Sequence, residues 1–175
     1  MYSQPGTSLW DSRQSNVEMK KMEIVVPVEV LRYDELTESD RQLVDAAIAA
    51  TERSYAPYSH FCVGAAIRMD NGEIVTGANQ DNVAYPSGTC AERSACFYAG
   101  ATYPGVPFRQ IAIAARGTDG ALTPVPTAPC GACRQALLEY ETLAGADVPL
   151  LLVGADCIYR LPSVKSTLPL AFTDF

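Results

Sequence analysis

The chain has the length and composition of one folded, acidic domain. Its 175 residues are 48% hydrophobic and 19% charged, which excludes an intrinsically disordered chain and provides enough apolar surface for one core. The formal net charge of −7 opposes binding along nucleic acid or on an anionic membrane surface. We therefore expect a small-molecule ligand, and neither a nucleic-acid nor a membrane partner.

The N-terminal part of the sequence favours a cytoplasmic protein. Residues 1–21 lack hydrophobic periodicity and an apolar stretch of the signal-peptide type, so we predict a flexible tail over 1–21 and a single domain over 22–175. No run of about 20 apolar residues predicts a transmembrane helix. Without an export signal, the six cysteines are expected to be reduced thiols.

The following segments alternate between strand and helix patterns. Residues 23–32 are rich in β-branched side chains, but Pro27 confines them to an edge strand or an extended arm. Thr37 and Thr89 are candidate N-caps of the first two helices, and Gly100 is a candidate stop for the second. Helices are predicted over 38–55, 90–99 and 131–143, and strands over 62–69, 73–77, 110–115, 150–153 and 157–160. This order predicts a three-layer α/β/α domain around a mixed sheet of about five strands.

Three cysteines stand at the starts of two predicted helices. Cys90 opens one helix, and Cys130 and Cys133 form a P-C-G-A-C motif at the start of another. Helix N-termini stabilise negative charge and therefore the thiolate form that binds zinc. Three protein ligands leave one position of a tetrahedral zinc ion open, which is typical of catalytic sites. We predict one Zn²⁺ per chain.

A glutamate completes this pattern. Glu92 follows Cys90 by two residues, and zinc-dependent base deaminases combine such a non-ligand glutamate with three cysteines and a P-C-x-x-C motif. Their reaction needs one carboxylate that takes a proton from water, passes it to the ring nitrogen and later helps ammonia leave. We therefore predict Glu92 as the catalytic proton shuttle.

Three longer segments resemble the homotetrameric cytidine deaminases that have a three-cysteine zinc site. They are YAPYSHFCVGAAI (55–67), NQDNVAYPSGTCAERSA (79–95) and APCGACRQ (128–135). The resemblance extends over most of the chain from about residue 23 and implies a cytidine-deaminase-like fold and a homotetramer. It also implies hydrolytic deamination of free cytidine and deoxycytidine to uridine and deoxyuridine in pyrimidine salvage, through a zinc-bound hydroxide with Glu92 as shuttle.

The same resemblance implies a set of substrate contacts. Phe61 is expected to stack on the base, and Asn79 and Asp81 to hold the ribose hydroxyls, with Gln80 and Ala91 also in the substrate site. The family usually has glutamate where this chain has Asp81. That side chain is one methylene shorter, so we expect the adjacent backbone, a bridging water or Asn79 to compensate.

Two further residues take roles from the resemblance. Arg93 resembles the residue that hydrogen-bonds to the thiolates and offsets the charge of the third one, and Arg134 is a second candidate for this role. Phe172, in the closing LPLAF segment, resembles a residue that reaches the active site of a neighbouring subunit.

Two alternatives share these motifs. A blasticidin-S deaminase has the same cysteine and Cys-Ala-Glu pattern, but the NQD segment and the YSHF loop favour a ribosyl substrate. A non-catalytic structural zinc domain would use a fourth ligand to close the site. Release of ammonia from cytidine distinguishes both from the leading hypothesis.

Overall fold

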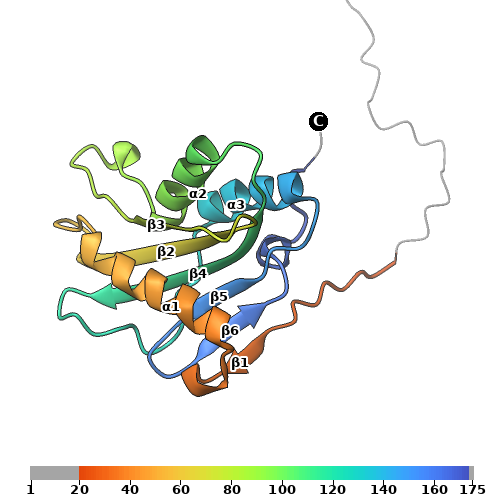
Figure 1. Ribbon diagram of the computed structural model, residues 1–175, viewed down its shortest axis with the longest axis horizontal. Coiled ribbons are helices and arrows are strands. Elements are labelled where there is room, and N and C mark those ends of the chain that lie inside the picture. The colour runs from red at the N-terminus through yellow and green to blue at the C-terminus, as the bar shows by residue number, and fades with distance from the viewer. Residues whose placement is uncertain (1–19, 174–175) are drawn as a thin grey trace, which may run out of the picture.

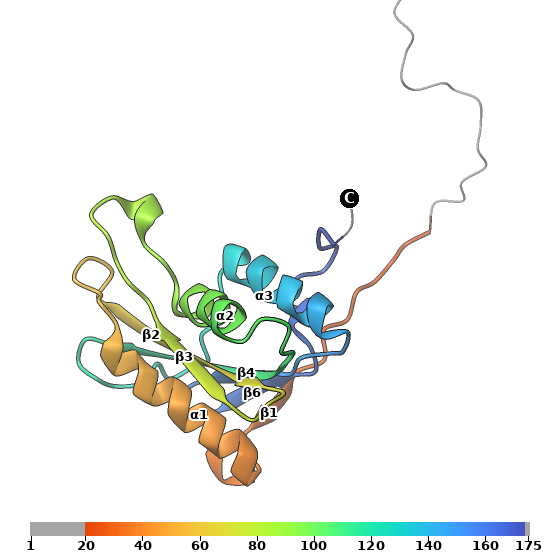
Figure 2. The same cartoon turned by 45° about the horizontal axis from the view of Figure 1, so that its top comes forward.

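The domain is a mixed β-sheet covered by helices on both faces. The computed structural model describes residues 20–173. The sheet has six strands in the order β1-β6-β5-β4-β2-β3, with α1 on one face and α2 and α3 side by side on the other (Figures 1 and 2). Its strands are β1 Glu29–Leu31, β2 Phe61–Met69, β3 Ile74–Ala78, β4 Phe108–Gly117, β5 Leu150–Val153 and β6 Ile158–Leu161, and its helices are α1 Glu38–Ala50, α2 Ala91–Thr102 and α3 Gly131–Ala144. The predicted three-layer α/β/α fold is confirmed.

Strand pairing explains why α2 and α3 share a face. β4 and β5 run parallel, whereas the other neighbouring strands are antiparallel. A parallel pair needs a long crossover connection, and α3 provides it. One buried cluster packs α2 and α3 against the sheet and a second packs α1 against the opposite face. The starts of α2 and α3 therefore come close together.

The structure differs from the sequence predictions in several details. The sheet has six strands rather than about five because the segment after Pro27 pairs with β6 as edge strand β1. The first helix ends at Ala50 and continues as a 3-10 turn over Thr51–Arg53. The N-cap of α2 is Cys90 rather than Thr89. These differences concern element boundaries and one edge, and they leave the layers unchanged.

Gly100 does not end α2, which continues to Thr102. A Cβ atom at Gly100 would lie 2.6 Å from the Tyr140 Oη atom, and the Tyr140 ring stacks on Phe108 with their centroids 4.5 Å apart. The glycine is thus needed for the close approach of α2 to α3, not for a helix stop.

Among residues 20–173, no helix is long and apolar enough to span a membrane. The tail expected over 1–21 lies outside the described residues except for Lys20 and Lys21, which have no regular secondary structure. The division into this tail and a single domain over 22–175 stays a prediction.

A buried ionic contact joins α1 to the sheet. The Asp40 carboxylate accepts hydrogen bonds from Thr37 Oγ1 at 2.7 Å, Gln110 Nε2 at 2.6 Å and Arg160 Nη2 at 2.6 Å. Burial alone would raise the pKa of Asp40, but the hydrogen bonds from Gln110 and Thr37 and the charge of Arg160 outweigh it. The pKa of Asp40 is therefore lower than its ordinary value.

We expect Asp40→Asn to lower the free energy of unfolding by about 2 kcal/mol at pH 7, the value of a hydrogen bond to a charged group. A depressed pKa contributes stability that is present above the unfolded-state pKa, about 4, and is lost as the pH falls through the lower folded-state pKa. Urea unfolding at pH 7, 5 and 3 should therefore show a difference between the wild type and the variant that shrinks only at pH 3. A difference that does not change with pH would contradict this role.

Candidate metal centre and active site

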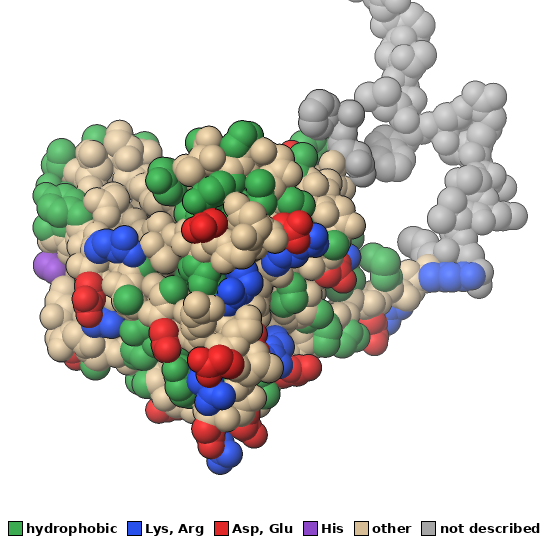
Figure 3. All heavy atoms as spheres, viewed as in Figure 1, with side chains coloured by type: hydrophobic (Ala, Val, Ile, Leu, Met, Phe, Trp, Pro, Cys, Tyr) green, Lys and Arg blue, Asp and Glu red, His purple; other side chains and the backbone are tan. Residues whose placement is uncertain are grey.

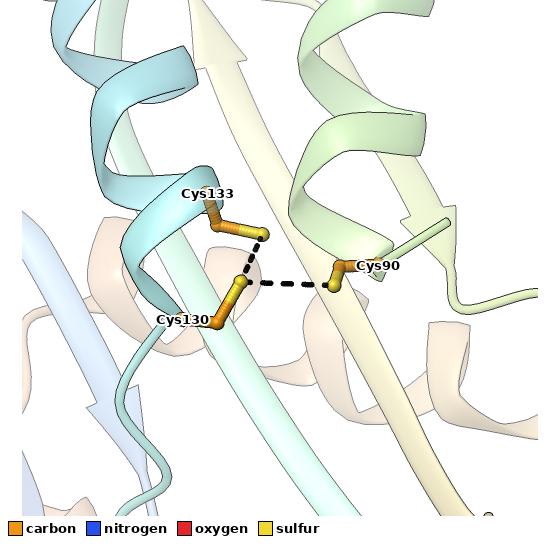
Figure 4. Close-up of side chains that lie close together, drawn as sticks. All are labelled: Cys90, Cys130 and Cys133. Carbon is orange, nitrogen blue, oxygen red and sulfur yellow. Dashed lines mark hydrogen bonds between the residues drawn. The ribbon is translucent and has the colours of Figure 1, made fainter. Parts of the chain in front are cut away.

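The three predicted cysteines meet where α2 and α3 begin. Cys90 is the N-cap of α2 and Cys130 the N-cap of α3, and Cys133 lies in the first turn of α3. The Sγ atoms of Cys90 and Cys130 are 3.9 Å apart and those of Cys130 and Cys133 are 3.4 Å apart (Figure 4). All three sulfur atoms lie within 4.8 Å of one another. Thiolates placed tetrahedrally about 2.3 Å from zinc would be about 3.8 Å apart, so this cluster fits that ion.

The cluster borders a pocket. Cys133 is buried, Cys90 is half-buried and Cys130 is exposed. A pocket of about 540 Å³ adjoins it, and its wall includes Cys90 and Cys130. An ion bound to the three sulfur atoms would therefore face a space large enough for a small molecule, as a catalytic site requires and a closed structural site does not.

The surroundings of Cys90 favour its thiolate form. A hydrogen bond from the Cys133 thiol and, after it, one from Arg93 lower the pKa of Cys90 to about 5. The Arg93 Nη2 atom is 3.8 Å from the Cys90 Sγ atom, and the N-terminus of α2 adds to the effect. The same contact with Cys90, together with burial and the nearby Glu92, raises the pKa of Cys133. These contacts favour the thiolate form of Cys90 over that of Cys133.

Glu92 lies beside this cluster. It is the second residue of α2, is 5% exposed and lines the pocket. Burial, reinforced by the negative charge of Cys90, raises the pKa of Glu92 above its ordinary value. A carboxyl group that holds a proton more readily than an exposed glutamate suits a residue that accepts and returns one.

The two candidate arginines have different partners. Arg93 donates to the Cys90 sulfur, as the sequence predicts. Arg134 instead donates to the carbonyl oxygen atoms of Pro129 at 2.8 Å and Thr167 at 2.7 Å. Its guanidinium thus joins the segment before Cys130 to the C-terminal part of the chain and does not compensate charge at the sulfur atoms.

Four of the five predicted substrate residues line the same pocket, and the fifth, Ala91, lies between two of its lining residues in the sequence. Phe61, Asn79, Gln80 and Asp81 line it, and Ala91 is fully buried as the first residue of α2. A backbone N–H at this helix position has no acceptor within the helix. The loop and helix segments that the motifs cover are therefore brought together in one place.

The side chains of the NQD segment also make contacts that sequence reasoning missed. Asn79 accepts from Val63 N at 2.7 Å and donates to the Phe61 carbonyl at 2.9 Å. Asp81 accepts from the backbone of the turn before Phe61. Gln80 donates its side-chain amide to backbone carbonyls, and its own backbone pairs with Thr89 in both directions. This segment therefore supports the Phe61 region in the protein itself.

The pocket wall also includes residues for which no role was predicted. Tyr58, Tyr85 and Thr127 line it, and the two tyrosines are 48% and 79% exposed. Both tyrosines stand inside the quoted motifs, and an exposed aromatic residue on a loop that carries a motif is a signal for ligand contact. Thr127 has no such signal because its segment becomes part of the wall only through the fold.

Phe172 lies apart from the pocket of its own chain. Its carbonyl accepts from Gln135 Nε2 at 2.9 Å, and the residue is 67% exposed. Its exposure fits a residue that contacts another molecule, and its predicted role across a subunit interface stays a prediction.

Comparison with known proteins places the chain in a family. The model of the "Cytidine and deoxycytidylate deaminase zinc-binding region" matches residues 37–144, which include all three clustered cysteines. The cytidine deaminase of Halalkalibacterium halodurans is 40% identical over 135 residues, covering 77% of this chain and 95% of that protein. The cytidine deaminase of Sporosarcina psychrophila is 37% identical over 133 residues, covering 75% of this chain and 90% of its own length.

Solved structures agree with the sequence comparison. The cytidine deaminase of Burkholderia pseudomallei has a TM-score of 0.64 at 38% identity, covering 78% of this chain and 100% of that one. The cytidine deaminase of Mycobacterium tuberculosis has a TM-score of 0.60 at 32% identity, covering 79% and 99% of the two chains. The predicted family, fold and zinc site are confirmed. The chain belongs to the family of zinc-dependent cytidine and deoxycytidylate deaminases.

Proposed function

We propose that the protein hydrolyses free cytidine and deoxycytidine to uridine and deoxyuridine, with release of ammonia. The observation that carries this proposal is the buried Glu92 beside three clustered cysteine sulfur atoms at one pocket of about 540 Å³. The names of the relatives support the same reaction. Water is consumed, the C4–N bond of the base is broken, and the amine leaves as ammonia.

Each side chain has a defined task in this reaction. Cys90, Cys130 and Cys133 would hold zinc, which when bound supplies Lewis-acid activation of a water molecule. Glu92 takes up the first proton that this water gives up and passes it to the ring nitrogen next to the reacting carbon. It then takes the second proton from the hydroxyl group that has been added to this carbon and delivers it to the leaving amine. Its burial keeps bulk water away from the proton that it carries.

The remaining residues orient the nucleoside. We propose that the Phe61 ring stacks on the base and that the Ala91 N–H donates to it. The NQD segment, residues Asn79, Gln80 and Asp81, lines the pocket and would face the sugar. In the proposed arrangement, the amino group of the base would lie at the cysteine cluster and the sugar toward the outer part of the pocket.

A substrate panel tests the proposal. Cytidine, deoxycytidine, cytidine monophosphate, blasticidin S and single-stranded DNA are each mixed with the zinc-loaded protein, and ammonia and the loss of cytosine absorbance are measured. We expect turnover of the first two substrates. Faster turnover of blasticidin S or of the oligonucleotide than of cytidine would contradict the proposed substrate class. If none of the compounds releases ammonia, the protein is a non-catalytic structural zinc domain.

Charge compensation at the cluster gives a prediction for Arg93. Three thiolates around Zn²⁺ leave a net charge of −1, and Arg93 donates to one of the sulfur atoms. We expect Arg93→Ala to lower kcat/KM by about tenfold with zinc retained, a typical loss for a residue that supports a metal ligand.

The double variant separates charge from geometry. Cys90→His removes one negative charge, so it should recover part of the activity that Arg93→Ala loses. Zinc content and kcat/KM are measured for the wild type, both single variants and the double variant, which together form a double-mutant cycle. Additive losses in the double variant would contradict the charge argument.

We propose that the protein is a homotetramer. Hydrophobic side chains gather over α2 and the loop before it, along the upper edge of the molecule in Figure 3. The exposed apolar residues of these segments are Val83, Tyr85, Phe97 and Tyr98. An interface between copies of the chain would bury these side chains and the exposed Phe172, and it would explain why they are apolar. Light scattering on the active protein is expected to give four chains, and an active monomer would exclude the assembly.

We further propose a place in pyrimidine salvage in the cytoplasm. The free, unpaired cysteines of the described residues suit a reducing compartment, and the proposed substrates are nucleosides rather than polymers. Isotope-labelled cytidine should enter the uridine pool of expressing cells and stay out of it when Glu92 is replaced.

A further inference from the structure

The segment that presents Phe61 to the pocket is a constrained turn. The His60 N–H donates to the Ala56 carbonyl at 3.1 Å, and His60 has a φ of +51°, a left-handed conformation that non-glycine residues adopt at a cost. Phe61 follows directly as the first residue of β2 and is 37% exposed at the pocket. Such a turn needs contacts from outside to hold its conformation.

The Asp81 carboxylate makes these contacts. Its Oδ2 atom accepts from Tyr58 N at 3.1 Å and from Ser59 N at 2.8 Å, and its Oδ1 atom accepts from Ser59 Oγ at 3.1 Å. The Ser59 hydroxyl oxygen in turn accepts from the Phe61 N–H at 3.4 Å. The carboxylate is thus connected to the backbone of Phe61 through one serine.

Backbone contacts fix Asp81 against the same segment. Its N–H donates to the Tyr55 carbonyl at 2.7 Å, and the Tyr55 N–H donates to the Asn79 carbonyl at 3.0 Å. Asp81 is therefore held through its backbone by Tyr55 and through its carboxylate by the turn. The short side chain of aspartate keeps the carboxylate at the turn backbone.

We propose that Asp81 is a positioning residue, whose carboxylate holds the 58–61 turn in the conformation that presents the Phe61 ring to the substrate base. This rests on the proposed function, because Phe61 matters only when a base occupies the pocket. The role does not depend on the sugar hydroxyls. Loss of the carboxylate should therefore weaken binding of a nucleoside whether or not its sugar carries hydroxyl groups at the 2′ and 3′ positions.

The test compares cytidine with 2′,3′-dideoxycytidine. The affinity of the dideoxynucleoside is measured as its KM or, where its turnover is slow, as its Ki against cytidine. We expect Asp81→Ala to weaken binding of dideoxycytidine by about tenfold, the effect of losing a hydrogen bond to a charged group. Binding of cytidine should be weakened by at least this factor, because the NQD segment also faces its sugar. Most of the change should be in KM, since Glu92 and the cysteine cluster are untouched.

Two milder variants and one control accompany Asp81→Ala. Asp81→Asn keeps an oxygen for the two backbone N–H groups and an amide for Ser59 Oγ, so it should restore most of the affinity. Ser59→Ala removes one of the three hydrogen bonds to the Asp81 carboxylate, and it should weaken the binding of both compounds by a smaller, equal factor. Asp119→Ala is the matched control, because Asp119 also accepts from a backbone N–H in a turn but does not line the pocket. It should leave both affinities unchanged.

The outcomes separate this proposal from the proposed function. A loss of affinity that appears with cytidine and disappears with dideoxycytidine would show that Asp81 acts on the sugar, and it would overturn the positioning role. Wild-type affinity of Asp81→Ala for both compounds would also overturn this role. If Asp81→Ala does not fold, equal penalties on both compounds in Ser59→Ala support the role, and a penalty confined to cytidine rejects it. A wild-type protein that does not deaminate cytidine would refute the proposed function instead.

Discussion

Replacement of Glu92 by glutamine is expected to lower the deamination rate by about three orders of magnitude, within the range for loss of a general acid–base group. The zinc content should stay at one ion per chain, because the three cysteines supply the ligands and the Glu92 carboxyl acts on protons. The amide has nearly the same shape as the buried carboxyl group. It neither takes up nor returns a proton, so the fold and the metal should be preserved.

Zinc analysis and steady-state kinetics on the same sample check this expectation. Glu139→Gln is a matched control, since Glu139 is an exposed glutamate of α3 and its loss of charge should change neither quantity. If Glu92→Gln loses zinc, Glu92 is a ligand. If it keeps both zinc and activity, another group carries the proton.

Removal of one thiolate should have the second large effect. Cys130→Ala leaves two of the three sulfur atoms, and we expect the zinc content to fall close to none and the activity with it. A ligand whose free concentration is about 1,000 times its Kd stabilises the folded state by about 4 kcal/mol. The free energy of unfolding measured in the presence of zinc should therefore fall by about this amount in Cys130→Ala. Metal and stability are lost together.

Chelation of the wild type provides the comparison. Wild-type protein treated with a chelator should unfold like Cys130→Ala, and the chelator should not destabilise Cys130→Ala further. Cys157→Ala is the control, because Cys157 is a free, half-buried cysteine outside the cluster of three. If Cys130→Ala retains one tightly bound zinc ion per chain, the assignment of this ligand is wrong.

Local patterns were sufficient for most of the fold. The uncharged segment 110–115 indicates the central strand β4, and the Gly-containing connection at Gly72 indicates the β2–β3 hairpin, where Gly72 has a φ of +87°. The sequence left open whether residues 23–32 form an edge strand or an extended arm, because β1 is completed by pairing with β6, about 130 residues later. Gly100 resembled a helix stop because its partner, Tyr140, lies on another helix. Such contacts leave no local signal.

The candidate site also combines features that local sequence predicts with contacts that only the fold creates. Cysteine spacing and the adjacent glutamate predict the metal cluster, since this chemistry depends on residue types at fixed positions. The use of Asn79 and Asp81 to hold the Phe61 turn could not be derived from the motifs. These hydrogen bonds depend on how closely two loops approach, and the antiparallel pairing of β2 with β3 brings these loops together.

Zinc titration of the metal-free protein tests the central claim most directly. Bound zinc, ammonia and uridine are measured at each step with cytidine present in excess. We predict that the rate rises in proportion to bound zinc and reaches a plateau at one ion per chain, with one ammonia formed for each uridine. Binding of one zinc ion per chain without ammonia release would contradict the account, because the cluster would then be a structural site.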